Sequence, residues 1–426
     1  MVKVCIYFQV HQPRRMKRFS VFDIGKDKDY FLDEHNKEIM ERVAKKCYLP
    51  GNKVLLKLIK ETKGAFKVAF SITGTAIEQF KRYAPEVLES FKELAKCPEV
   101  EFLGETYFHS LAWLYSKKEF EEQVLMHKRL MKETFGRVPT IFRNTELIYT
   151  NALADDVGRL GFKGILAEGA DHLLGWRSPN YIYQTNNEKP IKLLLKNYRL
   201  SDDIAFRFSN HGWNEYPLTA DKYTKWVNAV NGNGTNINLF MDYETIGEHQ
   251  WASTGIFRFF SEWPRQVLSN PDNSFVLPSD LAKMDATDSV DVPGLVSWAD
   301  LERDLSAWLG NEMQQSALKE IYAIEEMVIK SKDDKLIKQW RELQTSDHFY
   351  YMCTKYFADG DVHKYFNPYD SPYESFIAFM NILNDIILRL KEQQIRDEVA
   401  HEALVKGGPF VSHSPSTLLD GGGSNG

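Results

Sequence analysis

The chain has 426 residues, of which 43% are hydrophobic and 26% are charged, and this usage excludes a disordered, collagen-like or coiled-coil protein. Its 53 basic and 59 acidic residues give a net charge of −6 at pH 7, which argues against a nucleic-acid-binding protein because such proteins need a concentrated basic face. The four cysteines stand far apart without a C-x-x-C pair, so a zinc ribbon and a small disulfide scaffold are excluded as well.

Seven short apolar segments, rich in β-branched and aromatic residues, predict seven buried strands in the first 247 residues. They span residues 4–10, 66–72, 100–103, 140–143, 164–167, 191–195 and 237–241. Segments of helical periodicity lie between most of them, at 53–62, 77–95, 118–135, 152–160 and 220–230. This alternation indicates a parallel α/β arrangement with both sheet faces covered. Phosphate-binding glycine motifs do not follow the strands, which favours a barrel over a nucleotide-binding doubly wound sheet.

The pattern changes beyond residue 250, where long helical segments replace the strands. Helices are predicted at 257–268, 298–309, 312–330, 336–353 and 372–390. We therefore expect a barrel over residues 1–290 and a helical region over residues 291–400. The stretch from Gly407 onward is rich in Gly, Ser and Pro, so we expect a flexible tail over residues 401–426.

Acidic residues or histidines follow six of the seven predicted strands, and in α/β barrels the carboxyl ends of the strands form the active-site face. Paired-carboxylate chemistry, as in glycoside hydrolysis, fits this pattern. Catalysis by a Ser nucleophile does not, because a G-x-S-x-G motif is missing. A metal centre is not favoured, because the histidines are scattered without an i, i+4 pair on a helix. The pattern alone does not choose among the candidate carboxylates Glu105, Glu146, Glu168, Asp202, Asp242 and Glu244.

Five segments in order give the chain a resemblance to glycoside hydrolase family 57, specifically to its α-amylase-like members, up to about residue 400. They are FQVHQP at 8–13, EFLGETYFHS at 101–110, FRNTE at 142–146, FMDYETIGEH at 240–249 and TSDHF at 345–349. The resemblance implies an incomplete (β/α)7 barrel followed by a C-terminal helical segment, in agreement with the seven strands predicted above. It implies neither a cofactor nor a catalytic metal.

The resemblance also implies roles for individual residues. Glu146 matches the nucleophile of the family and Asp242 matches its general acid/base. Asp242 must carry a proton before it acts as an acid, and a like-charged neighbour such as Glu244 would favour that form. Because one matched segment lies in the helical region, we expect that region to complete the active-site cleft. The residues expected to bind sugar are His11, Glu105, His109, Glu244, Asp347 and His348, with Trp213 and Trp298 as candidate stacking platforms.

The leading hypothesis is a retaining glycoside hydrolase that cleaves α-1,4-glucosidic bonds of starch, glycogen or maltooligosaccharides. A 4-α-glucanotransferase or a branching enzyme would use the same carboxylate pair, with a sugar in place of water. A metal-dependent polysaccharide deacetylase and a non-catalytic α-glucan-binding protein are alternatives from other classes. The start of the sequence does not resemble a signal peptide, and apolar stretches of membrane-spanning length are not seen, so we expect a cytoplasmic protein without membrane or nucleic-acid partners.

Overall fold

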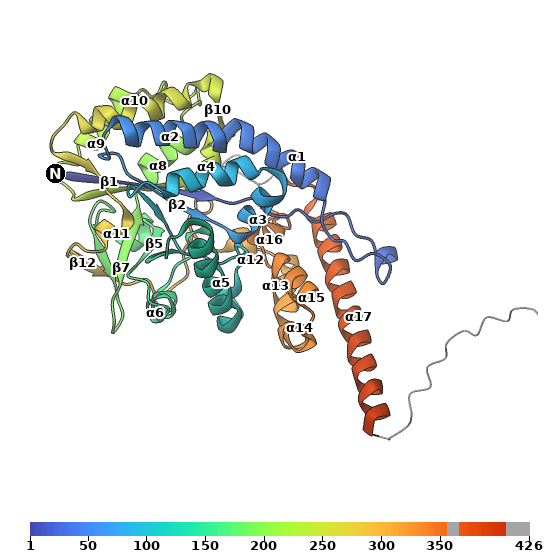
Figure 1. Ribbon diagram of the computed structural model, residues 1–426. Helices are drawn as coiled ribbons and strands as arrows, with labels where there is room; N and C mark the ends of the chain where they lie inside the picture. The colour runs from blue at the N-terminus through green and yellow to red at the C-terminus, as the bar shows by residue number, and fades with distance from the viewer. Residues whose placement is uncertain (356–365, 406–426) are drawn as a thin grey trace, which may run out of the picture.

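Seven parallel strands form the centre of the molecule, and each lies where the sequence predicts one (Figure 1). The computed structural model describes residues 1–355 and 366–405. The central strands are β1 (Val2–Val10), β2 (Val68–Ile72), β3 (Val100–Phe102), β4 (Ile141–Arg143), β5 (Gly164–Glu168), β7 (Lys192–Lys196) and β8 (Asn236–Asp242).

The strands follow one another around an incomplete barrel in the order β8-β1-β2-β3-β4-β5-β7. A single parallel bridge between Gly104 and Phe142 joins the β3 side to β4. Between β7 and β8, the amide of Asn197 donates to the carbonyl of Asn238 at 2.9 Å, and the Asn238 side chain donates to the carbonyl of Leu195 at 2.9 Å. The predicted fold class, an incomplete (β/α)7 barrel followed by helices, is therefore confirmed.

Five short strands that the sequence did not predict lie at the margins of this barrel. Among them, β6 pairs antiparallel with β7, β11 extends the sheet beside β1, and β9 and β10 pair with each other. Their bounds are β6 (Tyr183–Thr185), β9 (Ile246–Gly247), β10 (Gln250–Trp251), β11 (Asn273–Phe275) and β12 (Asp288–Val290).

Helices cover the outside of the barrel, with α2, α4 and α10 on one side and α5 and α6 on the other (Figure 1). The predicted helix at 77–95 is broken into two, because Pro85 disfavours helical backbone at Ala84, whose φ is −147°. The α-helices of this layer are α1 (Asp33–Val43), α2 (Leu49–Glu61), α3 (Gly74–Tyr83), α4 (Pro85–Ala95), α5 (Lys117–Phe135), α6 (Asn151–Arg159), α7 (Asp171–Leu174), α8 (Tyr198–Ala205), α9 (Ala220–Asn228), α10 (Ile256–Leu268) and α11 (Pro278–Leu281). Shorter turns are η1 (Val21–Asp23), the π-helical η2 (Ala44–Tyr48), η3 (Ala112–Leu114), η4 (Thr145–Leu147), η5 (Tyr243–Thr245) and η6 (Ala252–Thr254).

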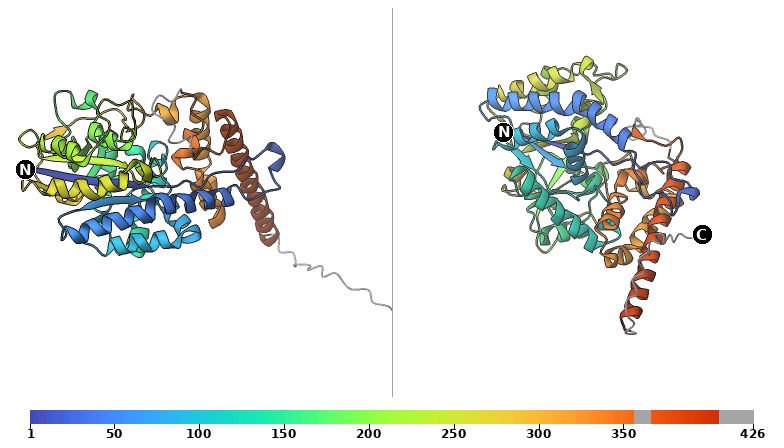
Figure 2. Two further views of the ribbon diagram at one scale, coloured as in Figure 1. Left: turned by 90° about the horizontal axis from the view of Figure 1, so that it is seen from above. Right: turned by 45° about the vertical axis from the view of Figure 1, so that its right-hand side comes forward.

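The C-terminal helices gather at the end of the barrel toward which β1 runs, opposite the N-terminus (Figures 1 and 2). They are α12 (Ser306–Leu309), α13 (Glu312–Ala323), α14 (Glu325–Ser331), α15 (Asp334–Glu342), α16 (Ser346–Tyr350) and α17 (Pro372–Val405). The helix predicted at 298–309 is wrong except for α12, because Asp300 and Arg303 adopt left-handed backbone with φ of 52° and 54°. Of the tail predicted at 401–426, residues 401–405 are instead the end of helix α17, and residues 406–426 lie outside the described residues. Among the helices that the structure describes, we find none with the length and apolar character needed to cross a membrane.

Side chains of the central strands alternate between the outer helices and the barrel interior. In β1, Ile6 and Phe8 pack with the outer layer, whereas Cys5 and Tyr7 belong to the interior cluster. Ala69, Ile141, Leu166, Leu194 and Phe240 of the other strands belong to that cluster, as does Leu103 directly after β3. Two residues further along the chain from Tyr7 and from each of these six positions, the next residue of the same alternation is polar in every case. We call these seven residues the polar ring: Gln9, Ser71, Glu105, Arg143, Glu168, Lys196 and Asp242.

Candidate active site

The polar ring closes the apolar interior at the carboxyl ends of the strands, facing the helical region. Its members are connected: Gln9 donates from Nε2 to both carboxylate oxygens of Glu105 at 3.3 Å, and its own Oε1 accepts from Ser71 at 2.8 Å. Gln9 also pairs in register with Asp242 of the neighbouring strand β8. Around the ring, the adjacent neutral groups Gln9 and Ser71 follow Asp242, and the other four members alternate between carboxylate and cation, so this end of the barrel is suited to acid–base chemistry.

Glu146 lies just beyond β4 on a sharply turned backbone. Glu146 and Leu147 both adopt left-handed conformations, with φ of 56° and 51°. For residues other than glycine this conformation costs roughly 1–2 kcal/mol each, and such strain is concentrated at functional sites. The turn returns Leu147 to the barrel interior and leaves Glu146 above the polar ring, with 6% of the residue exposed.

Both carboxylate oxygens of Glu146 are held by hydrogen bonds. His109 Nε2 lies 3.0 Å from Oε1, and the indole Nε1 of Trp298 donates to Oε2 at 2.7 Å. The backbone carbonyl of Glu146 also accepts from the amide of Trp298 at 3.2 Å. The orientation of this carboxylate is therefore fixed from two sides.

His109 is shared between two buried carboxylates. Its Nδ1 lies 3.5 Å from Glu105 Oε2, on the opposite side of the ring from Glu146. Burial alone would lower the pKa of His109, but the contacts with Glu105 and Glu146 outweigh burial and raise it to about 9. The same imidazolium, together with His127 and Arg143, holds the pKa of Glu105 below its usual range despite burial. At neutral pH the group therefore contains one cation between two carboxylates.

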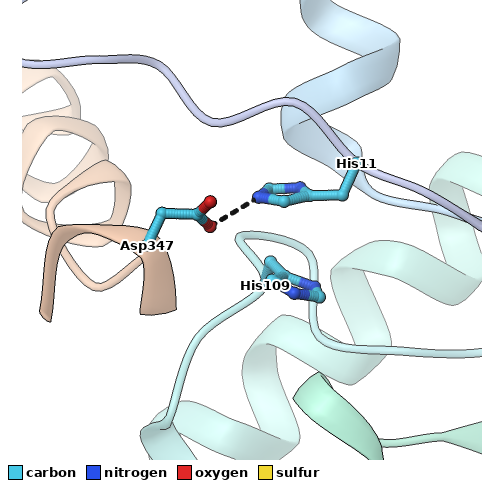
Figure 3. Close-up of side chains that lie close together, drawn as sticks. All are labelled: His11, His109 and Asp347. Carbon is cyan, nitrogen blue, oxygen red and sulfur yellow. Dashed lines mark hydrogen bonds and ion pairs between the residues drawn. The ribbon is translucent and has the colours of Figure 1, made fainter. Parts of the chain in front are cut away.

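His11 joins the barrel to the helical region. Figure 3 shows its ring beside Asp347 of α16 and above His109, with Nε2 3.0 Å from Asp347 Oδ2. Its Nδ1 lies 3.0 Å from the Thr73 hydroxyl. Burial and the charge of His109 lower the pKa of His11 to about 4, although Asp347 acts in the opposite direction. A neutral His11 that donates to Asp347 and accepts from Thr73 satisfies all of these contacts.

The nitrogen and oxygen atoms of His11, His109 and Asp347 lie within 4.8 Å of one another, a grouping that a metal ion can use. The two imidazoles, however, are stacked with centroids 4.1 Å apart and an interplanar angle of 21°. Their in-plane lone pairs therefore lie in two nearly parallel planes, whereas the lone pairs of metal ligands must converge on one point. Because both Nε2 atoms already contact carboxylates, we interpret the group as a hydrogen-bonded cluster.

Asp242 ends β8 in the polar ring, whereas Glu244 lies beyond the strand and is directed away from the ring. The turn η5 carries the Glu244 carboxyl into the outer core, where Oε1 accepts from Gln12 at 3.2 Å and from the Tyr48 hydroxyl. Burial, followed by the charge of Asp242, raises the pKa of Glu244 to about 8. The sequence suggested that a negative charge on Glu244 would favour the protonated form of Asp242. In the structure Glu244 itself retains a proton at neutral pH, so it does not supply that charge.

A second charged group, which we call the Lys196 cluster, adjoins Trp298. Lys196 lies 3.1 Å from Asp202 and 3.5 Å from Glu168, and Arg303 approaches these carboxylates at 3.4 and 3.5 Å. Burial lowers the pKa of Lys196, but the two carboxylates outweigh it and raise that pKa. Sequence reasoning missed Lys196 and Arg303. Period-two alternation from Leu194 would have placed Lys196 inward, whereas the loop residue Arg303 carries no such signal.

Besides Glu244, two further predicted sugar-binding residues are turned away from Glu146. His348 of α16 is fully buried, and burial lowers its pKa to about 4. Trp213 packs edge-on against Trp226 of α9, with centroids 6.1 Å apart. The structure therefore brings together His11, Glu105, His109, Glu146, Trp298 and Asp347, with Asp242 in the polar ring below them.

Comparison with known proteins supports the pattern of matched segments. The family model described as "Glycosyl hydrolase family 57" matches residues 5–293. A curated protein from Methanocaldococcus jannaschii, named "Putative alpha-amylase", is 41% identical over 408 residues. That alignment covers 92% of this chain and 85% of the relative.

Solved structures share the fold at low sequence identity. A GH57-type branching enzyme from Pyrococcus horikoshii has a TM-score of 0.63 at 15% identity, and the match covers 98% of both chains. A 4-alpha-glucanotransferase from Thermococcus litoralis also has a TM-score of 0.63, at 14% identity. The match covers 82% of this chain but only 56% of the glucanotransferase. An alpha-amylase from Thermotoga maritima has a TM-score of 0.57 at 12% identity, with 94% and 98% covered.

Proposed function

The chain belongs to glycosyl hydrolase family 57 and is a glycoside hydrolase-type enzyme, and from this premise we propose that it is a retaining glycosidase of α-1,4-glucans. Its substrates would be starch, glycogen or maltooligosaccharides. The name of the relative from Methanocaldococcus jannaschii supports this substrate class. The observation that carries the proposed chemistry is the Glu146 carboxylate, which is held on both oxygens at the mouth of the barrel.

In the first step, Glu146 attacks the anomeric carbon while Asp242 donates a proton to the departing sugar oxygen. The two residues come from β4 and β8, which have β1, β2 and β3 between them on one side and β5 and β7 on the other. Strands so placed face each other across the barrel mouth. A retaining mechanism needs its carboxyl groups about 5–5.5 Å apart, on either side of the scissile bond.

In the second step, Asp242 removes a proton from water, which displaces Glu146 from the anomeric carbon. The imidazolium of His109 remains beside Glu146 throughout and compensates the negative charge that returns to the carboxylate. His11 and Asp347 lie beside this point and offer hydrogen-bonding groups to sugar hydroxyls, whereas Glu105 is fully buried and contacts Gln9 and His109.

We also propose that the helical region is part of the active site. Asp347 bonds to His11 across the boundary, and the amide of Ser346 donates to the carbonyl of His109 at 2.9 Å. Thr345 donates from its hydroxyl to the carbonyl of Phe108 at 3.0 Å. The loop that positions His109 is thus fixed by α16, so the barrel and the helices form one catalytic unit.

The decisive experiment incubates the protein with maltooligosaccharides of defined length and follows the products by chromatography and the anomeric configuration by NMR. We expect shorter products only, with the α-anomer appearing first. Longer products would identify a glucanotransferase or branching enzyme, in which a sugar replaces water. A β-anomer as first product would contradict retention. Binding of glucan without turnover would identify a carbohydrate-binding protein, and loss of turnover on chelation would favour metal-dependent chemistry.

A further inference from the structure

Trp298 has a contact that a sugar-stacking platform does not need. We propose that Trp298 is a positioning residue, which holds the nucleophile Glu146 in its attacking orientation through the indole N–H. This inference rests on the proposed function of Glu146. It assigns the indole to the protein's own carboxylate, in place of the stacking role predicted from the sequence.

The segment that carries Trp298 is fixed against the segment that carries Glu146. Tyr149 and Val296 exchange backbone hydrogen bonds of 2.9 and 3.1 Å in an antiparallel bridge. The amide of Asn151 donates to the carbonyl of Val292 at 3.0 Å, one step further along. This pairing ends at the hydrogen bond from the Trp298 amide to the Glu146 carbonyl. The backbone pairing therefore fixes the position of the indole relative to the carboxylate.

Two buried cations lie over the ring of Trp298. The guanidinium of Arg143 is 5.0 Å from the ring centroid, and the ammonium of Lys196 is 5.3 Å from it. Cations at such distances are attracted to the electron-rich face of an indole and withdraw electron density from it. The indole N–H therefore becomes a stronger donor. Arg143 and Lys196 of the polar ring thus strengthen the hydrogen bond to Glu146 through the indole, without contacting the carboxylate themselves.

His109 and Trp298 each contact a different oxygen of the Glu146 carboxylate. When one oxygen forms a bond to the anomeric carbon and the glycosidic bond breaks, the leaving oxygen takes its proton from Asp242. The negative charge of Glu146 is lost in the ester, and the donor on the other oxygen can stay in place. The carboxylate plane therefore keeps its orientation while the charge changes. Glu146 then needs no reorientation between its ionised form and the ester, which lowers the barrier to attack.

The test compares Trp298→Phe with Trp298→Ala on one maltooligosaccharide. Trp298→Phe removes the N–H but keeps a ring, so a positioning role predicts that kcat falls about 10- to 100-fold. KM should change less than about twofold, and the acidic limb of the kcat/KM profile should move to higher pH because the carboxylate anion loses a donor. A stacking role predicts the reverse: Trp298→Phe stays near wild type, and Trp298→Ala raises KM.

Trp113→Phe is the matched control, because Trp113 Nε1 donates to Asp156 Oδ2 at 2.6 Å. It removes another buried indole–carboxylate bond, away from Glu146, so it should lower the melting temperature without moving the pH profile. Trp298→His, which restores an N–H donor, should recover part of kcat. An unchanged kcat and acidic limb in a folded Trp298→Phe protein would overturn the inference.

A second readout does not depend on turnover. In protein labelled with ¹⁵N-tryptophan, the indole N–H signal that disappears in Trp298→Phe identifies Trp298. We expect this signal to lie downfield and to shift in Glu146→Gln, since a charged acceptor is replaced by a neutral one. A signal indifferent to Glu146→Gln would overturn the positioning role. A wild-type protein inactive on all α-glucans, but with a responsive signal, would instead contradict the proposed function alone.

Discussion

His109 Nε2 lies 3.0 Å from Glu146 Oε1, while Nδ1 of the same ring lies 3.5 Å from Glu105, so one imidazolium serves two buried carboxylates. The charge of the His109 ring therefore determines the electrostatic potential at the Glu146 carboxylate, the proposed nucleophile. Because the pKa of His109 is raised to about 9, the controlling proton leaves well above neutral pH.

The first prediction concerns the alkaline limb of activity. We expect kcat/KM to fall as the pH rises through about 9, where His109 loses its proton. His109→Gln should lower activity at neutral pH and lack this limb. The stabilising contribution of His109 is complete below its ordinary pKa of about 6.5 and disappears as the pH rises through about 9. Melting temperatures at pH 6 and 10 check this, and a flat activity profile between pH 8 and 10 would contradict it.

The second prediction concerns stability in acid. His11 and His348 are buried with pKa values lowered to about 4, whereas an unfolded histidine titrates near 6.5. The unfolded chain therefore binds more protons between these values, and stability should fall as the pH drops from about 6.5 toward 4. His348→Leu should flatten this decline and leave KM unchanged, because the ring is fully buried. A raised KM in His348→Leu would restore His348 as a sugar ligand.

The third prediction concerns the catalytic pair. Glu146→Gln and Asp242→Asn should each lower kcat by at least about 10³-fold while the melting temperature stays close to wild type. Glu101→Gln is the matched control: Glu101 is another carboxyl of the barrel interior, two residues before Leu103, and it accepts from the amide of Ser279 at 2.9 Å. It should keep full turnover. Full activity in either catalytic variant would refute the two-carboxylate mechanism.

The fourth prediction concerns the Lys196 cluster. Lys196→Met removes a buried cation that lies between Glu168 and Asp202. Breaking a buried ion pair on one side costs about 3–5 kcal/mol, since a carboxylate is left without its partner. Denaturant unfolding should register this loss, and the double variant Lys196→Met with Glu168→Gln should recover part of it. Equal stability of the wild type and Lys196→Met would mean that Arg303 alone neutralises the cluster.

The fifth prediction concerns the barrel without its helices. One apolar cluster combines Phe142 and Ile165 of the barrel with Trp308, Trp340 and Ile386 of the helical region. A fragment of residues 1–290 exposes half of that cluster, so we expect it to lack a cooperative unfolding transition and to have no activity. Near-ultraviolet circular dichroism during heating provides the measurement. A sharp transition in the fragment would show that the barrel folds independently.

The sequence contains enough information to predict the strands and the polar ring. Buried strands of a parallel barrel read as apolar runs, and alternation from any interior residue, such as Phe240, points to a polar position such as Asp242. Most helices beyond residue 250 were also predicted, although their breaks were not, and of the helix predicted at 298–309 only α12 is present. A break depends on single residues such as Pro85, or on left-handed positions that periodicity does not reveal.

The positions of Trp298, Glu244 and His348 required the structure. The contact of Trp298 depends on pairing between segments about 150 residues apart, and on left-handed residues in its own loop. Glu244 leaves the strand pattern at η5, where alternation ends. His348 directly follows Asp347 on a helix, and successive residues there point about 100° apart, so only one of the two can face His11.

The left-handed backbone at His109, Glu146 and Leu147 has an evolutionary consequence. Glycine and asparagine occupy this region more readily than glutamate, so replacing Glu146 by one of them relieves backbone strain but removes the contacts of its carboxylate with His109 and Trp298. A screen that selects only for heat resistance therefore favours inactive proteins at position 146 wherever the relieved strain exceeds the lost contacts. Selection for turnover must oppose this drift, and the two pressures meet at the residue that attacks the substrate.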